Sequence, residues 1–174
     1  MSEETPTEEQ RPLGVYTRPK GGNGWRDWIT TVDHKKIGIL YGAAALFFFI
    51  IGGIEALLIR LQLATPNGTV LGAEMYNQVF TMHGITMIFL AAMPLAAAFA
   101  NYLIPLQIGA RDVAFPRLNA MSFWVFLAGG IFINLSWLLG GAPDGGWFGY
   151  APNSGIVFSP SVGMDFYAIG LQIT

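Results

Sequence analysis

One histidine, His83, lies inside a segment that is otherwise apolar enough to cross a lipid bilayer. An ionisable group at membrane depth is costly without a partner, so it indicates a functional site by default. Neutral imidazole is the commonest metal ligand among side chains, which makes His83 a candidate metal ligand. The alternative is a structural histidine bonded to a neighbouring helix. The other histidine, His34, lies among charged residues outside the apolar segments.

A cation and several glycines accompany His83 on the same side of the membrane. Arg60 ends the first apolar segment, while Gly84 and the pair Gly52-Gly53 leave room for a bulky planar ligand or a closely packed helix. A haem fits this arrangement, because a histidine binds its iron and a cation can neutralise or hydrogen-bond a peripheral group. Glu55, one turn inside the segment, is expected to pair with Arg60 or a neighbouring subunit and receives no catalytic role.

A second polar group lies toward the other side, where Asn101, Asp112 and Asn119 surround a loop. A carboxylate at a water-filled mouth flanked by amides is a candidate proton collector. The alternative reading makes Asp112 a solvated surface charge and Asn119 a helix cap. Asn134, within the third apolar segment, is expected to hydrogen-bond a neighbouring helix.

The composition indicates which class of protein positions these residues. The chain is 53% hydrophobic and 11% charged, whereas a soluble domain is about one quarter charged. The formal net charge of −2 suggests no nucleic-acid partner, and the absence of cysteine excludes disulfides and thiolate metal sites. The chain is therefore expected to be an integral membrane protein in contact with the lipid bilayer.

The predicted fold is all-α, with three transmembrane helices and the start of a fourth. Pro94 should kink the second helix. Because the last helix is too short to cross, we expect the chain to be a piece of a longer protein. We assign residues 1–24 to a polar N-terminal tail and 25–174 to the membrane domain. The predicted helices are Ile37–Ile59, Tyr76–Leu103, Ala120–Leu139 and Phe166–Thr174.

The basic residues predict the orientation. They gather before the first helix and in the loop after the second, which the positive-inside rule places in the cytoplasm. The N-terminus is then cytoplasmic, and Trp147 and Tyr150 lie near the outer interface. The basic residues on the inner side are Arg11, Arg18, Lys20, Arg26, Lys35, Lys36, Arg111 and Arg117.

Several ordered motifs resemble a known family, subunit I of the haem-copper terminal oxidases of the cytochrome c oxidase type. The resemblance covers about residues 25–174, and the long loop motif that begins at Pro105 is highly specific. The matching stretches are Thr31-Val32-Asp33-His34-Lys35-Lys36-Ile37-Gly38 with Tyr41, Leu57-Leu58-Ile59-Arg60, Thr81-Met82-His83-Gly84, Pro105 through Asn119, and Ser122-Phe123-Trp124.

The resemblance implies a twelve-helix bundle and a haem site. By resemblance, His83 is one axial ligand of the low-spin haem, haem A, and Arg60 contacts the formyl group of that haem. Trp147 and Tyr150 match a stretch near the haem propionates. The second axial ligand, a high-spin haem and copper B are expected from the chain beyond Thr174.

The resemblance also implies a proton-uptake channel. Asp112 opens it from the inner side, Asn101 and Asn119 line its lower part, and Tyr41 lies near it. Two departures limit the match. Ala120 stands where many relatives carry a second asparagine, which concerns the fine geometry of the channel. Gln62 stands where some relatives carry an acidic ligand of a non-redox metal, so we predict no such metal.

By resemblance, the complete protein is a proton-pumping enzyme of the aerobic respiratory chain in the cell inner (plasma) membrane. It would reduce oxygen to water with electrons from cytochrome c, alongside other oxidase subunits that include a subunit II. The segment alone is expected to be inactive. Alternatives are a quinol oxidase of the same superfamily, with nitric oxide reductase a weaker match, and a non-redox proton-coupled transporter in which His83 and Asp112 relay protons.

Overall fold

The computed structural model describes residues 24–174, which divide into two parts, 24–31 and 32–174. The first part holds the short helix α1 (Trp25–Ile29), which closes where the Thr30 hydroxyl donates to the carbonyl of Arg26 over 2.9 Å. Residues 1–23, with most of the predicted tail, lie outside the described residues. The division at residue 24 between tail and membrane domain stays a prediction.

The second part consists of helices and loops, with no strand among residues 32–174. Three continuous helical runs are long and apolar enough to cross a membrane: His34–Gln62, Ala73–Gln107 and Pro116–Leu135. This confirms the predicted all-α membrane class and its three spanning helices. The elements are α2 (His34–Gln62), α3 (Ala73–Ile85), the π-helix η2 (Thr86–Ala92), α4 (Met93–Gln107), α5 (Pro116–Leu135) and α6 (Gly163–Ile173).

The helices begin and end where local hydrogen bonding allows. α2 begins before the predicted Ile37 because Asp33 caps it, its carboxylate accepting the backbone N–H of Lys35 over 2.9 Å. α5 begins at Pro116, a favoured first position. It ends at Leu135 instead of the predicted Leu139, because tighter three-residue turns come next.

The second spanning run differs most from the prediction. In place of a simple kink at Pro94, the structure has the wider π-helical turns of η2 directly before this proline, which lies at the start of α4. Proline lacks a backbone N–H and crowds the preceding turn, so an altered hydrogen-bond pattern at this position is expected. The helix also continues through Pro105, which the sequence placed in the loop.

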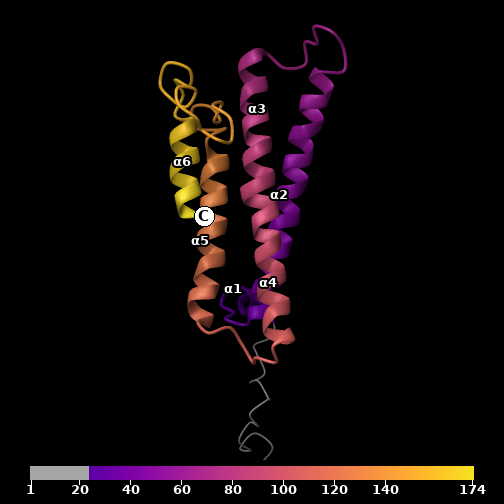
Figure 1. Ribbon diagram of the computed structural model, residues 1–174, viewed down its shortest axis with the longest axis vertical. Helices are drawn as coiled ribbons and strands as arrows, with labels where there is room; N and C mark the ends of the chain where they lie inside the picture. The colour runs from indigo at the N-terminus through magenta and orange to yellow at the C-terminus, as the bar shows by residue number, and fades with distance from the viewer. Residues whose placement is uncertain (1–23) are drawn as a thin grey trace, which may run out of the picture. The chain divides into compact units, whose positions relative to one another are not determined.

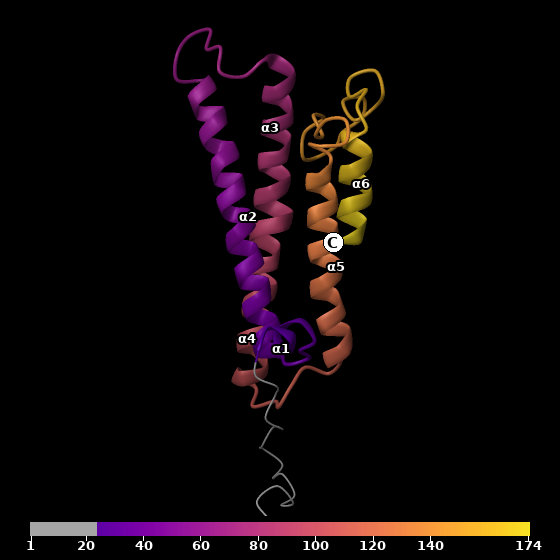
Figure 2. The same ribbon diagram turned by 180° about the vertical axis from the view of Figure 1, so that it is seen from behind.

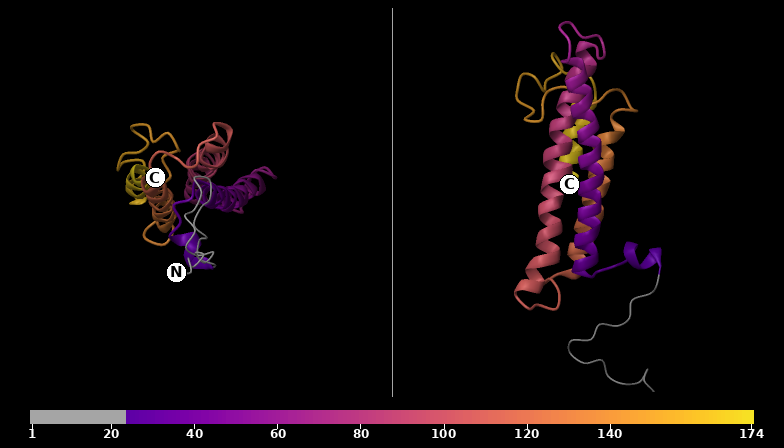
Figure 3. Two further views of the ribbon diagram at one scale, coloured as in Figure 1. Left: turned by 90° about the horizontal axis from the view of Figure 1, so that it is seen from below. Right: turned by 90° about the vertical axis from the view of Figure 1, so that its right-hand side faces the viewer.

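Figures 1 and 2 show the arrangement of residues 32–174. α2 runs beside the continuous α3–η2–α4 rod, and α5 runs beside α6. Figure 3 shows α2 and this rod side by side along their length. The loops 63–72 and 136–162 lie at one end, and the loop 108–115 lies at the other with the start of α2. The predicted orientation requires successive loops to lie at opposite ends of the helices, as they do here.

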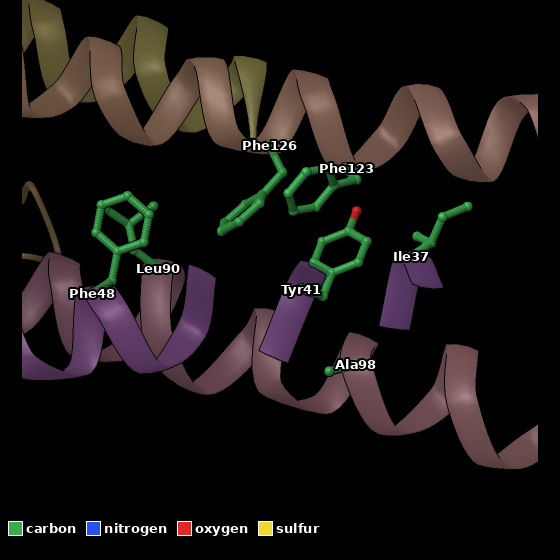
Figure 4. Packing of buried hydrophobic residues seen from close by; sticks show 7 residues of the cluster. All are labelled: Ile37, Tyr41, Phe48, Leu90, Ala98, Phe123 and Phe126. Atoms are coloured by element: carbon green, nitrogen blue, oxygen red, sulfur yellow. The ribbon is translucent and has the colours of Figure 1, made fainter. Parts of the chain in front are cut away.

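Two buried clusters hold the helices together. Figure 4 shows the first, in which Tyr41 of α2 points toward α5 and packs edge-on against Phe123, with ring centroids 5.2 Å apart. The second joins Met82 and Ile85 of α3 to Ile133 of α5. At most 33% of the most apolar stretch of each spanning helix is buried within the chain. Their remaining apolar surface is suited to lipid or to further protein.

Candidate functional site

His83 lies near the end of α3 and bonds to the neighbouring helix α2. Its Nδ1 is 2.9 Å from the backbone carbonyl of Gly52. A carbonyl oxygen only accepts, so Nδ1 carries the hydrogen and Nε2 of the neutral ring is left as the acceptor or metal-binding nitrogen. Metal-binding histidines are commonly oriented by such a bond from the other ring nitrogen. The ring is half-buried, so it has an open side.

The glycines around His83 permit close packing. A side chain at Gly52 would lie 3.1 Å from Met87, and one at Gly84 would lie 3.0 Å from the ring of Trp147. The space that the sequence left for either a planar ligand or a close neighbour is filled by these neighbours. Gly53 differs, since nothing lies within 4 Å of a side chain placed there. Of these three glycines, only Gly53 leaves an open side.

The segment between α5 and α6 is bonded to the helix that carries His83. The backbone N–H of Gly146 donates to the Thr81 hydroxyl over 3.0 Å. The hydroxyl of Tyr167 on α6 donates to the carbonyl of Trp147, whose ring lies 6.2 Å from Phe89 between centroids. The sequence analysis gave no role to Thr81, although it belongs to a matched motif, or to Tyr167, because their roles depend on contacts between distant segments.

Trp147 and Tyr150 belong to one aromatic stack. Phe148 joins them, with ring centroids 3.8 Å from Trp147 and 5.0 Å from Tyr150. Trp147 thus lies against the His83 helix, while Tyr150 is exposed. Arg60 is also exposed, and within residues 24–174 the structure gives it no hydrogen bond or ion pair. The structure brings Trp147 next to the histidine turn but leaves Arg60 apart.

Glu55 does not pair with Arg60. Its side chain is 7% exposed and faces the buried hydroxyl of Thr86 at the start of η2. Neither Oε2 of Glu55 nor this hydroxyl has a hydrogen-bond partner among the described residues. Within residues 24–174 the expected ion pair with Arg60 is therefore wrong, because the Glu55 side chain faces Thr86 of η2. The alternative, a partner in a neighbouring subunit, stays a prediction.

At the other end of the molecule, three polar residues form a chain of hydrogen bonds. The hydroxyl of Ser122 donates to the carbonyl of Asn119 over 2.8 Å. Its single hydrogen is then used, so the Tyr41 hydroxyl, 3.0 Å away, donates to it. The side-chain nitrogen of Asn119 is buried without a partner within the described part. Tyr41 and Asn119 are thus brought together by Ser122, which was part of a sequence motif but had no predicted role.

Asn101 and Asp112 lie at this same end but in separate local bonds. The amide of Asn101 donates to the carbonyl of Ala97 over 2.9 Å, and a carboxylate oxygen of Asp112 accepts the backbone N–H of Val113 over 2.9 Å. Asp112 is half-buried. Neither of these two bonds reaches Asn119, although all four predicted channel residues lie at one end of the bundle.

The hydrogen bond of Asn134 also differs from the predicted one. The sequence predicts a bond to a neighbouring helix, whereas the amide of Asn134 donates to the carbonyl of Gly130 in α5 itself, over 2.8 Å. The two residues are one turn apart, which lets the side chain reach a carbonyl of its own helix.

The fold and the site together define the class of the protein. Within residues 24–174, three helices of membrane length are the feature of a multi-pass membrane protein, and one of them carries an oriented histidine. The family model described as Cytochrome C and Quinol oxidase polypeptide I matches residues 36–174. The chain belongs to this family, that of subunit I of the haem-copper oxidases.

Similar proteins carry names from both branches of this family. The chain is 60% identical over 157 residues to cytochrome c oxidase subunit 1 of Bacillus subtilis (strain 168), covering 90% of the chain and 25% of that protein. Identity is 61% over 163 residues to the subunit 1 of Bacillus sp. (strain PS3), covering 93% and 26%.

A relative of the other branch, the probable quinol oxidase subunit 1 of Staphylococcus aureus (strain USA300), is 51% identical over 150 residues, covering 86% of the chain and 22% of that protein. The chain therefore spans about a quarter of the length of these curated relatives. Membership of the family favours an oxidase over the transporter alternative.

Proposed function

We propose that the protein containing this chain is a terminal oxidase that reduces oxygen to water with electrons from cytochrome c and moves protons across the membrane. The segment would supply one axial ligand of the low-spin haem and the entrance of a proton-uptake channel. The observation that carries the proposal is the bond from His83 to the carbonyl of Gly52, which fixes the ring in a membrane helix and leaves Nε2 for iron.

The residues present fit one half of a haem site. Residues 24–174 hold no group of three or more His, Cys, Asp or Glu side chains that could bind a metal ion by themselves. A single histidine suits a haem iron, because the porphyrin supplies the equatorial ligands. When bound, haem A, a second high-spin haem and copper B would supply the electron transfer and oxygen chemistry. Their other protein ligands must come from outside this chain.

Further residues have proposed roles around the haem. Arg60 would contact the haem formyl group, and its side chain is exposed within residues 24–174. Trp147 and Tyr150 would lie near the propionates. Trp147 contacts Gly84, the residue next to His83 in sequence, and this contact supports a position of Trp147 near the haem.

Proton uptake is proposed at the end that carries the loop 108–115. Asp112, half-buried in this loop, would collect protons from water. Asn101 and Asn119 would hold water in the lower channel. The hydrogen-bond chain from Tyr41 through Ser122 to Asn119 supports a polar path between α2 and α5.

The electron donor has a second candidate, a quinol, because relatives at 51% identity are named probable quinol oxidases. Other oxidase subunits, including a subunit II, are the proposed partners. The proposed location is the cell inner (plasma) membrane, with the N-terminus in the cytoplasm. The basic residues near the start of α2 and in the loop 108–115 support this orientation.

Replacement of the proposed iron ligand tests the function. We expect His83→Ala in the complete oxidase to abolish the absorption bands of the low-spin haem, because alanine offers no ligand atom. The measurement is the reduced-minus-oxidised spectrum of the purified enzyme, with pyridine haemochrome quantification of total haem. The matched control is Asn134→Ala, which removes a polar group whose amide bonds within α5. An unchanged low-spin spectrum in His83→Ala would reject the ligand role.

A further inference from the structure

The last turns of α4 contain a carbonyl that the helix cannot satisfy. In an α-helix the carbonyl of Asn101 would accept the backbone N–H four residues later, and that residue is Pro105, which has no N–H. Pro105 is buried inside the helix. A backbone carbonyl left unpaired away from water is unfavourable, so this position calls for a donor from elsewhere.

His34 of α2 is that donor. Its Nδ1 lies 2.8 Å from the carbonyl oxygen of Asn101, and since the carbonyl only accepts, Nδ1 carries the hydrogen. The side chain is 1% exposed, so little water competes for the bond. The sequence had placed His34 outside the apolar segments and assigned it no role.

The start of α2 is shaped for this contact. Asp33 caps the helix through the N–H of Lys35, which fixes the turn that carries His34. One turn later, Gly38 lets α2 and α4 approach so closely that a side chain there would lie 3.0 Å from the carbonyl of Ala98. The short approach between the helices is what brings the His34 ring within reach of Asn101.

The bond also constrains the chain on the C-terminal side of Asn101. The backbone of Asn101 is held by His34 and its side-chain amide by the carbonyl of Ala97, which together set the direction of its amide oxygen. Beyond Pro105 the chain turns into the loop of Asp112, and the N–H of Ala110 donates to the carbonyl of Pro105 over 2.8 Å. The loop is therefore tied back to the same turn of α4.

We propose that His34 is a positioning residue for the proton-uptake entrance: by donating to the carbonyl that Pro105 exposes, it holds Asn101 and the base of the Asp112 loop in their working arrangement. This inference rests on the proposed function. It assigns no proton transfer to His34 itself. It predicts that the requirement for His34 exists because of Pro105.

The test uses the complete oxidase in lipid vesicles with three sets of variants. His34→Leu removes the donor, and His34→Asn keeps an N–H close to the position of Nδ1. Pro105→Ala restores the backbone N–H that can bond the Asn101 carbonyl within the helix. Asp112→Asn gives the reference rate of proton uptake for an enzyme whose proposed entrance is impaired. The readouts are the rate of proton uptake per haem and the low-spin haem spectrum, which His34→Leu should leave unchanged.

We expect His34→Leu to slow proton uptake several-fold toward the Asp112→Asn level. His34→Asn, and the double variant His34→Leu with Pro105→Ala, should recover most of the wild-type rate. A role limited to stability would lower the yield of folded enzyme but leave the rate per haem intact, and this result would overturn the proposal. Failure of Pro105→Ala to rescue His34→Leu would also overturn it.

The Asp112→Asn variant separates the role of His34 from the existence of the entrance. If Asp112→Asn slows uptake and His34→Leu does not, only the role of His34 is rejected. If Asp112→Asn leaves uptake unchanged, the proposed entrance is wrong and the inference about His34 falls with it.

Discussion

Both histidines of the chain donate from Nδ1 to a backbone carbonyl on a neighbouring helix, yet their surroundings differ. His34 is sealed between α2 and α4, and its target is a carbonyl that a proline has left unpaired. His83 is half-buried, and its target, Gly52, lies inside a regular helix. The same bond thus completes a helix in one case and orients a ring with an open side in the other.

The contact between Gly84 and Trp147 gives a prediction at the scale of one residue. A side chain at Gly84 would lie 3.0 to 3.2 Å from three atoms of Trp147. We expect Gly84→Val in the complete subunit to lower the free energy of unfolding by about 1–3 kcal/mol through overpacking. The measurement is the thermal unfolding midpoint in detergent.

The matched control is Gly53→Val on α2, where nothing lies within 4 Å within the described part. Equal losses for the two variants would contradict the idea that Trp147 makes the difference, and would point instead to the β-branched side chain itself.

At the scale of helices, the sequence predicted the elements better than their ends and contacts. Apolar length identified all three spanning helices. The π-helical turns of η2 were missed, because they depend on backbone hydrogen bonding and no residue pattern marks them. The continuation of α4 through Pro105 was missed because its support comes from His34, 67 positions from Asn101.

For the candidate site, too, some residues could be predicted from the sequence and others could not. Residue type and position singled out His83 and Asp112, whose roles stay predictions. They were not enough to find Ser122 or Tyr167, whose roles exist only once α2 meets α5 and once α6 meets the segment before it. Residue type and position also led to wrong ion-pair or hydrogen-bond partners for two polar side chains. A polar side chain in an apolar helix can reach several partners, and only the packing selects one. These two residues are Glu55 and Asn134.

The pair α5 and α6 gives a prediction at this scale. A side chain at Gly170 would overlap the side chain of Ile133 and lie 3.2 Å from the carbonyl of Gly129. We expect Gly170→Ala to force the two helices apart and to lower the free energy of unfolding by about 1–3 kcal/mol. The measurement is chemical unfolding of the complete subunit in detergent.

A double variant checks the cause. Ile133→Ala alone should cost about 2–5 kcal/mol, because it leaves a cavity. Combined with Gly170→Ala, it should cost clearly less than the sum of the two single changes, since the new methyl group enters that cavity. Additive losses would mean that Ile133 is not what a side chain at position 170 meets.

At the scale of the whole molecule, the described chain buries only a minority of the residues in its membrane-length helices. At most 33% of the apolar stretch of each spanning helix is buried by the chain itself. The chain spans about a quarter of the length of its relatives, and the apolar flanks of its helices are suited to lipid or to further protein. Within residues 32–174, successive loops lie at opposite ends of the helices.

The two ends can be tested because the chain has no cysteine of its own. We expect Thr65→Cys and Ala151→Cys to react with a membrane-impermeant maleimide from one side, and Ala114→Cys to react from the other, in vesicles of known orientation. All three positions are exposed. In the proposed orientation the first two face outward. Labelling of all three from the same side would contradict three membrane crossings.

The π-helical segment η2 has a geometric consequence for the rod in which it lies. Its wider turns hold more residues than α-helical turns, so every side chain after Ala92 is rotated about the helix axis relative to an uninterrupted α-helix. His83 precedes this phase shift and Asn101 comes after it. In an uninterrupted α-helix these two positions, about five complete turns apart, would share one face, so η2 changes which side chains of the rod after Ala92 face its neighbours.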